Sequence, residues 1–139
     1  ETGEIIRKIG NEFGNTTGRP RRCGWIDLVA LQFAIMINGV TQIIMTKADI
    51  LDTLDQLKVC NGYKINGEEK NYVPFQMNRV EIEPLYKTFE GWNADITACD
   101  TYESLPQKMK EYINYLNTFL GVPVKYISNG PGKNQIVSA

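Results

Sequence analysis

The chain has 139 residues, of which 42% are hydrophobic and 22% are charged, and its formal net charge is −1. This length and composition fit one globular domain or the larger part of one, and the near-neutral charge argues against a nucleic-acid-binding protein, which is more often basic overall. Because the chain has no histidine, histidine general-base catalysis and histidine-type zinc sites are excluded within it.

The three cysteines are odd in number and widely spaced, so they favour free thiols in a reducing, cytoplasmic compartment over a disulfide framework. Residues 28–46 carry no charge, but Gln32, Asn38 and Gln42 interrupt the apolar run before it reaches the length of a membrane span. We therefore expect a buried helix followed by a buried strand, and no membrane partner.

The first elements are a short helix or strand within residues 1–14 and a helix over residues 25–37. Residues 25–37 are apolar on nearly every face, which predicts a helix packed deep in the core with Asp27 in its first turn. An Asn-Gly turn at residues 38–39 follows, and the β-branched residues within 42–46 predict a buried strand.

Three strands are expected in the middle of the chain. Residues 57–65 alternate loosely and end at Asn66-Gly67, a hairpin signal. Residues 72–75 and 80–86 are also strand candidates, and the prolines that flank them indicate edge positions.

The C-terminal part predicts a helix and a strand. Residues 104–107 form a capping-box pattern with a proline in the first turn, and Gly121 and Pro123 end the helix. A final buried strand spans residues 122–127. The fold class is therefore α/β with one small antiparallel subregion. Apolar residues recur at helical spacing, namely Leu105, Met109, Tyr112, Ile113, Leu116, Phe119 and Leu120.

Positive charge is concentrated in residues 15–22, the arginine loop, which holds three of the five arginines and two adjacent threonines. A guanidinium is a planar fork of donors that fits carboxylates and phosphates. The loop is therefore predicted to grip a small, multiply charged anion. The alternative is a solvated basic turn.

A second motif, Thr46-Lys47-Ala48-Asp49, follows the strand predicted over residues 42–46. A Lys-x-Asp sequence after a strand is typical of guanine recognition, because one carboxylate can accept both the N1–H and the exocyclic amine of guanine while the lysine stem lies over the purine face. The alternative is a loop salt bridge.

A third motif, Ser128-Asn129-Gly130, follows the last predicted strand. In guanine sites a later loop of this kind brings a small polar residue and backbone N–H groups to guanine O6. In an open α/β sheet both loops lie at the carboxyl edge, where ligands bind. The alternative is an ordinary Gly/Pro turn.

Together these residues resemble the adenylosuccinate synthetase family, over essentially the whole chain and over the C-terminal third of such an enzyme. The resemblance rests on residues 12–27 (EFGNTTGRPRRCGWID), Thr46-Lys47-Ala48-Asp49-Ile50-Leu51-Asp52, Lys58-Val59-Cys60-Asn61-Gly62-Tyr63, Glu90-Gly91-Trp92 and Gly121-Val122-Pro123-Val124.

The resemblance implies the C-terminal part of a P-loop-NTPase-like mixed sheet with flanking helices and a small antiparallel insert. It also implies a cytoplasmic, homodimeric, GTP-dependent ligase that joins IMP and L-aspartate, with Mg²⁺ linking the nucleotide phosphates. The chain is then a single fragment in four parts: the substrate loop region (1–24), a helix, strand and guanine loop (25–56), the insert (57–103), and a helix, strand and second guanine loop (104–139).

The family pattern also implies which residues bind each substrate. Thr16, Thr17 and Gly18 would close over aspartate, Arg19 would reach aspartate and the IMP ribose, Arg21 would hold aspartate near GTP, and Pro20 and Arg22 belong to the same loop. Guanine would be bound by Lys47, Ala48 and Asp49, with Ser128, Asn129 and Gly130 completing the pocket. The family's catalytic groups and metal ligands lie outside this chain, so the chain alone is expected to be inactive.

Two positions in the last loop depart from the family pattern, because Asn129 replaces a threonine and Lys133 an arginine. Two other classes of protein remain as alternatives. A regulatory GTPase would share the two guanine loops but needs no aspartate clamp. A nucleic-acid-binding domain would use Arg19, Arg21 and Arg22, but the net charge argues against it.

Overall fold

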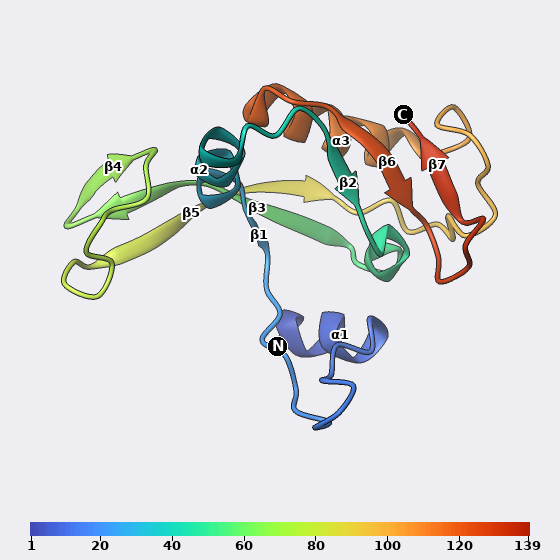
Figure 1. The fold of residues 1–139 in the computed structure, drawn as a ribbon, viewed down its shortest axis with the longest axis horizontal. Helices are drawn as coiled ribbons and strands as arrows, with labels where there is room; N and C mark the ends of the chain where they lie inside the picture. The colour runs from blue at the N-terminus through green and yellow to red at the C-terminus, as the bar shows by residue number, and fades with distance from the viewer.

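The computed structural model describes residues 1–139, which form three α-helices, one 3-10 helix and seven strands (Figure 1). The helices are α1 (Thr2–Ile9), α2 (Leu28–Asn38), the 3-10 helix η1 (Ala48–Leu51) and α3 (Gln107–Leu120). The strands are β1 (Ile26–Asp27), β2 (Ile43–Met45), β3 (Gln56–Ile65), β4 (Glu68–Lys70), β5 (Ile82–Glu90), β6 (Val124–Ser128) and β7 (Ile136–Ser138).

The strands form two sheets. In the first, β3 pairs in parallel with β1 and antiparallel with β4 and β5. In the second, β6 lies between β2, its parallel neighbour, and β7, its antiparallel neighbour. The predicted mixed α/β class is confirmed, and the expected antiparallel region is the β3–β4–β5 ribbon.

Helix α3 joins the two sheets into one core. Its apolar side chains recur every three or four residues, so they form one stripe, and 18 buried residues from both sheets and the helices form a single cluster around it. Figure 1 shows α2 and α3 on the same side of the long β3–β5 ribbon. The buried stripe of α3, predicted from its spacing, consists of Met109, Tyr112, Ile113, Leu116 and Leu120.

Helix α2 begins three residues later than predicted. Trp25 precedes strand β1, and Asp27 is the N-cap of α2, where its Oδ1 accepts a hydrogen bond from the backbone N–H of Ala30 at 3.0 Å. Its other oxygen accepts from the hydroxyl of Tyr63. The predicted start was wrong because the apolar residues before Asp27 serve the parallel pairing with β3 instead of a helix turn.

The prediction that α2 lies deep in the core was also wrong. Only Leu28, Val29 and Ile35 are buried, while Met36 and Ile37 are 69% and 62% exposed. The strand after it differs from prediction in the same way, because Ile44 of β2 is exposed. An all-round apolar sequence therefore does not mean all-round burial in this chain.

The central hairpin follows prediction more closely. Strand β3 turns at Asn66 and Gly67, both with positive φ, and pairs with β4 and β5. Strand β5 is an edge strand, as its proline suggested, although it spans residues 82–90 instead of 80–86. Residues 72–75 are not a strand but bends and turns, and the side chain of Phe75 is fully exposed.

The end of the chain holds two further differences. The capping box does not form, because Pro106 is the N-cap of α3 and the hydroxyl of Ser104 donates to the carbonyl of Thr101 instead. Strand β7 was not predicted. Gly121 ends α3 in the left-handed conformation, as expected.

The N-terminal residues form a small lobe. Figure 1 shows α1 and the loop that follows it below the rest of the molecule, joined to it by the segment that leads into β1. Ile6 nevertheless reaches the core cluster, so the lobe is packed against the body. No helix in the structure combines the length and apolar character that crossing a membrane requires.

Candidate functional site

The predicted motifs meet at one cavity of about 510 Å³. Three separate parts of the chain contribute to its wall: the end of α1 with the following loop, the turn between β2 and η1, and the loop after β6. The lining residues are Ile9, Gly10, Asn11, Phe13, Asn15, Arg21, Lys47, Asp49, Ile50, Gly130 and Pro131. Arg21, Lys47, Asp49 and Gly130 are thus brought together from all three predicted motifs.

The parallel pairing of β2 and β6 places two of these parts side by side. Met45 pairs with Ile127, so residues 46–49, the Lys-Asp loop, and residues 128–132, the Gly130 loop, leave the sheet at the same carboxyl edge. The placement expected from the strand order is therefore confirmed for the two loops.

Lys47 has an unusual backbone conformation. Its φ is 56°, in the left-handed region that a residue with a Cβ rarely adopts, and η1 begins immediately after it. Its ammonium group donates to the carbonyl of Gly10 at 2.7 Å and pairs with the carboxylate of Glu12. The charged end of Lys47 is therefore held by the N-terminal lobe.

Glu12 connects the lysine to the arginine loop. One carboxylate oxygen binds Lys47 and the other binds the Arg21 guanidinium at 2.7 Å. Hydrogen bonds from Lys47 and then Arg21 lower the pKa of Glu12 below its ordinary value of 4.5. Glu12 was not predicted to take part in the site. Its position at the start of the family signature was the only feature of the sequence that pointed to it.

Asp49 lies at the cavity with an unsatisfied acceptor. Its Oδ1 atom is buried and accepts no hydrogen bond. Because the Asp49 side chain lines the cavity, its carboxylate can accept hydrogen bonds from a ligand that brings N–H groups. The carboxylate is held at this position because it occupies the first turn of η1.

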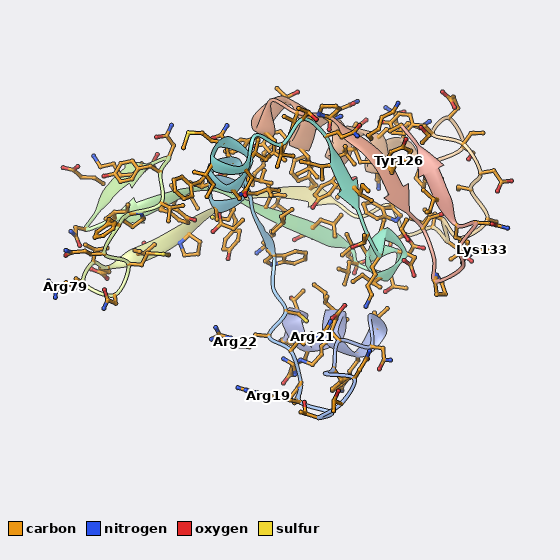
Figure 2. The ribbon with its side chains drawn as sticks, in the orientation of Figure 1. Arg19, Arg21, Arg22, Arg79, Tyr126 and Lys133 are labelled. Carbon is orange, nitrogen blue, oxygen red and sulfur yellow. The ribbon has the colours of Figure 1, made fainter.

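The arginine loop is a closed turn whose side chains diverge. A bridge between Phe13 and Pro20 closes it, and the hydroxyl oxygen of Thr17 accepts from the backbone N–H of Arg19. Figure 2 shows Arg19 and Arg22 extending away from the rest of the molecule, whereas Arg21 binds Glu12 at the cavity. Thr16, Thr17, Gly18, Arg19, Pro20 and Arg22 do not line the cavity and are exposed apart from their loop contacts.

The Gly130 loop contributes backbone more than side chains. The hydroxyl of Ser128 donates to the carbonyl of Gly130 at 3.1 Å, which tightens the turn. The side chain of Asn129 is fully buried and points into the protein, and Ala48 is also buried. Neither side chain lines the cavity. Both residues were predicted to bind the ligand, and at these two positions only the backbone could face it. Lys133 is exposed, and Figure 2 shows it at the right-hand edge of the body, apart from the N-terminal lobe.

We predict that the link through Glu12 depends on pH. A carboxyl with a lowered pKa stabilises the folded chain fully above its ordinary pKa of 4.5, and this contribution is lost as the pH falls through the lower folded value. Replacing Glu12 by Gln should therefore lower the free energy of unfolding above pH 5, and the difference from wild type should shrink below pH 4.5. Denaturant unfolding between pH 3 and 7 measures this.

The matched control for this experiment is Glu83→Gln, because Glu83 is exposed on β5 and makes no ion pair. A pH-dependent difference that appears in both variants would come from the loss of a carboxylate in general and not from the Glu12 ion pairs. A difference for Glu12→Gln that stays constant down to pH 3 would show that the ion pairs do not couple the lobe to Lys47.

Comparison with known proteins identifies the family. A sequence model described as adenylosuccinate synthetase matches residues 1–137. The chain belongs to the adenylosuccinate synthetase family. This membership supports the ligase interpretation over a regulatory GTPase.

Two similar adenylosuccinate synthetases come from Flavobacterium psychrophilum and Cytophaga hutchinsonii. The first is 46% identical over 138 residues, which is 99% of this chain and 33% of the relative. The second is 49% identical over 134 residues, which is 96% of this chain and 31% of the relative. The chain thus spans about a third of the length of the adenylosuccinate synthetases that it matches.

The fold agrees with this membership. A solved structure of fully ligated adenylosuccinate synthetase from Plasmodium falciparum superimposes with a TM-score of 0.92 at 35% identity, over 99% of this chain and 34% of that one. The α/β arrangement described above is therefore the arrangement of the corresponding third of an adenylosuccinate synthetase.

Proposed function

We propose that this chain is the part of a GTP-dependent ligase that binds guanine and aspartate, in an enzyme that joins IMP and L-aspartate to form adenylosuccinate. The observation that carries the proposal is the meeting of Arg21, Lys47, Asp49 and Gly130 at one cavity. The chain spans a third of its relatives, so the remaining parts of the site would come from the rest of such an enzyme.

The chemistry of the cavity suits guanine. Asp49 lines the cavity with a carboxylate, and guanine presents two adjacent donors that adenine lacks. Because Glu12 holds the ammonium group of Lys47, the lysine stem is left beside the cavity, where it can cover the purine face. Gly130 also lines the cavity, and its backbone would meet guanine O6.

The arginine loop suits a dicarboxylate. The guanidinium groups of Arg19 and Arg22 make no ion pair, the side chains of Thr16 and Thr17 are exposed, and Arg21 of the same loop lines the cavity. We assign the loop to aspartate, with Arg19 reaching the IMP ribose and Gly18 and Pro20 shaping the turn. Both carboxylates of aspartate can then be bound by donors from one segment.

In the proposed reaction GTP transfers its γ-phosphoryl group to the 6-oxygen of IMP, and the amino nitrogen of aspartate then displaces that phosphate. Mg²⁺ would neutralise the nucleotide phosphates. By the family pattern, we place the Mg²⁺ ligands in the rest of the enzyme. What this chain does is to bind and orient guanine and aspartate. We further expect a cytoplasmic homodimer.

The proposal is tested by exchange of the matching segment. The third of the Flavobacterium psychrophilum relative that matches this chain would be replaced by the 138 matching residues of this chain, and adenylosuccinate formation would be measured with GTP or ATP. We expect activity that requires GTP, IMP and aspartate, and none from the 139-residue chain alone. A folded chimera that uses ATP as well as GTP would contradict the guanine assignment.

A further inference from the structure

A segment outside the cavity connects the two loops that form it. Asp52, directly after η1, accepts a hydrogen bond from the backbone N–H of Ile96 at 3.0 Å and another from the indole N–H of Trp92 at 2.7 Å. The Lys-Asp loop is therefore tied, through the residue that follows η1, to residues 92–99, which we call the spacer segment.

The Gly130 loop is tied to the same segment by Asn129. The amide of this buried side chain donates to the carbonyl of Ile96 at 2.7 Å and to that of Cys99 at 2.9 Å. Ile96 is itself fully buried. Its N–H group is thus bound by Asp52, after η1, and its C=O group by Asn129 of the Gly130 loop.

A further tie comes from Gln135, which lies three residues after the Gly130 loop and directly before β7. Its amide N–H donates to the carbonyl of Thr97 at 3.3 Å, and its amide oxygen accepts from the backbone N–H of Gly132 at 2.8 Å. A Cβ atom at Gly130 would collide with this side chain. Gln135 therefore packs under the turn that brings Gly130 to the cavity.

The start of the spacer segment is fixed as well. The N–H of Gly91 donates to the carbonyl of Asp55 at 2.8 Å, and a Cβ atom at this position would collide with the backbone of Leu54. Only glycine allows this close approach, so the spacer segment leaves β5 in one direction.

The side chain of Asn129 is only partly satisfied by hydrogen bonds. Its Oδ1 atom is buried and has no hydrogen-bond partner. A buried polar side chain with one unsatisfied atom is a poor choice for stability alone. Its two donated hydrogen bonds fix the Gly130 loop against the spacer segment, which gives this side chain a use beyond packing.

We propose that the spacer segment sets the distance between the two cavity loops, and that Asp52, Asn129 and Gln135 are positioning residues for guanine-nucleotide binding. None of the three lines the cavity; Asp52 lines a neighbouring hollow with Asp49. They act on the ligand through Asp49 and Gly130. This inference rests on the proposed function of the cavity.

The test uses Asn129→Leu in the complete enzyme that contains this chain, because leucine has a similar shape and donates nothing. We expect the KM for GTP to rise about 10-fold, which corresponds to about 1.4 kcal/mol, while the KM for IMP changes less than 2-fold. A residue with a merely structural role would lower the thermal midpoint and the active fraction, but not change the KM of the folded enzyme for one substrate.

The matched control is Asn117→Leu. Asn117 also joins two elements by a partly buried side chain, because its Oδ1 accepts from the N–H of Val124 at 2.7 Å, but it lies away from the cavity. It should cost stability and leave the KM for GTP unchanged. An equal rise in both variants would overturn the proposal.

Gln135→Ala decides the question if Asn129→Leu does not fold, since Gln135 is partly exposed and its loss leaves the core intact. We expect a 3-fold to 5-fold rise in the KM for GTP, to order of magnitude, from the loss of its two hydrogen bonds. If Asp49→Asn weakens GTP binding and Gln135→Ala does not, the spacer role is wrong and the guanine site stands. If Asp49→Asn has no effect, the proposed function itself fails.

Discussion

Replacing Asp49 by Asn should weaken GTP binding about 100-fold and leave IMP binding unchanged in the complete enzyme. The carboxylate can accept from both N1–H and the amine of guanine, whereas an asparagine in the same place can accept only one of them and turns its own donor toward the other. The loss of one charge-assisted hydrogen bond and the clash of two donors together cost about 2.8 kcal/mol. Isothermal titration with each nucleotide measures the two affinities.

A gain of binding provides the sharper control for this variant. Xanthine carries a carbonyl oxygen where guanine carries the amine, so it offers one donor and one acceptor to residue 49. The Asp49→Asn enzyme should therefore prefer xanthosine triphosphate over GTP, and the wild type should show the reverse preference. A variant that has merely lost its structure would bind neither nucleotide.

The opposite outcome is equally clear. If IMP and GTP lose affinity by the same factor, Asp49 does not read guanine. Its buried Oδ1 would then need another partner, and the neighbouring hollow, which Asp49 lines together with Thr53 and Asn93, offers side-chain donors.

The parts of the fold that were predictable from sequence are those in which one segment carries its own signal. Helix α3 has a complete apolar stripe and a glycine at its end, and β3 ends at an Asn-Gly turn, so both were placed within two residues. Helix α2 has no polar face, so its sequence could not show which side is buried. Its start depends on the pairing of β1 with β3, which lies 33 residues away (Ile26 with Val59).

The candidate site likewise contains residues that were predictable from the sequence and residues that were not. The Lys-Asp loop and the Gly130 loop were predictable because each follows a strand, and parallel strands bring such loops to one edge. Glu12 was not, because its role is to bind two cations that lie 9 and 35 residues away in the chain. Asn129 was assigned to the ligand, whereas its amide is directed at carbonyl groups of residues 96 and 99, a contact that only the folded chain creates.

Replacing Arg21 by Leu should lower kcat/KM for aspartate about 50-fold and change the KM for GTP much less, because a guanidinium that holds a carboxylate contributes about 2 to 3 kcal/mol. Steady-state kinetics of the complete enzyme with each substrate varied in turn would measure this. The matched control is Arg79→Leu, an exposed arginine that Figure 2 shows at the far tip of the β4–β5 end of the molecule, and we expect it to leave all three substrates unaffected.

The structure also defines a competing explanation that the kinetics can separate. Arg21 binds Glu12, and Glu12 binds Lys47, so loss of the arginine could act through the lysine on guanine instead of directly on aspartate. In that case Arg21→Leu and Glu12→Gln would both raise the KM for GTP and leave aspartate unchanged. If Arg21 binds aspartate directly, Arg21→Leu should lower kcat/KM for aspartate. Glu12→Gln should not lower it, because this change leaves the guanidinium free to bind aspartate. An aspartate dependence that is the same in wild type and Arg21→Leu would exclude the clamp and leave Arg21 as a support for Lys47.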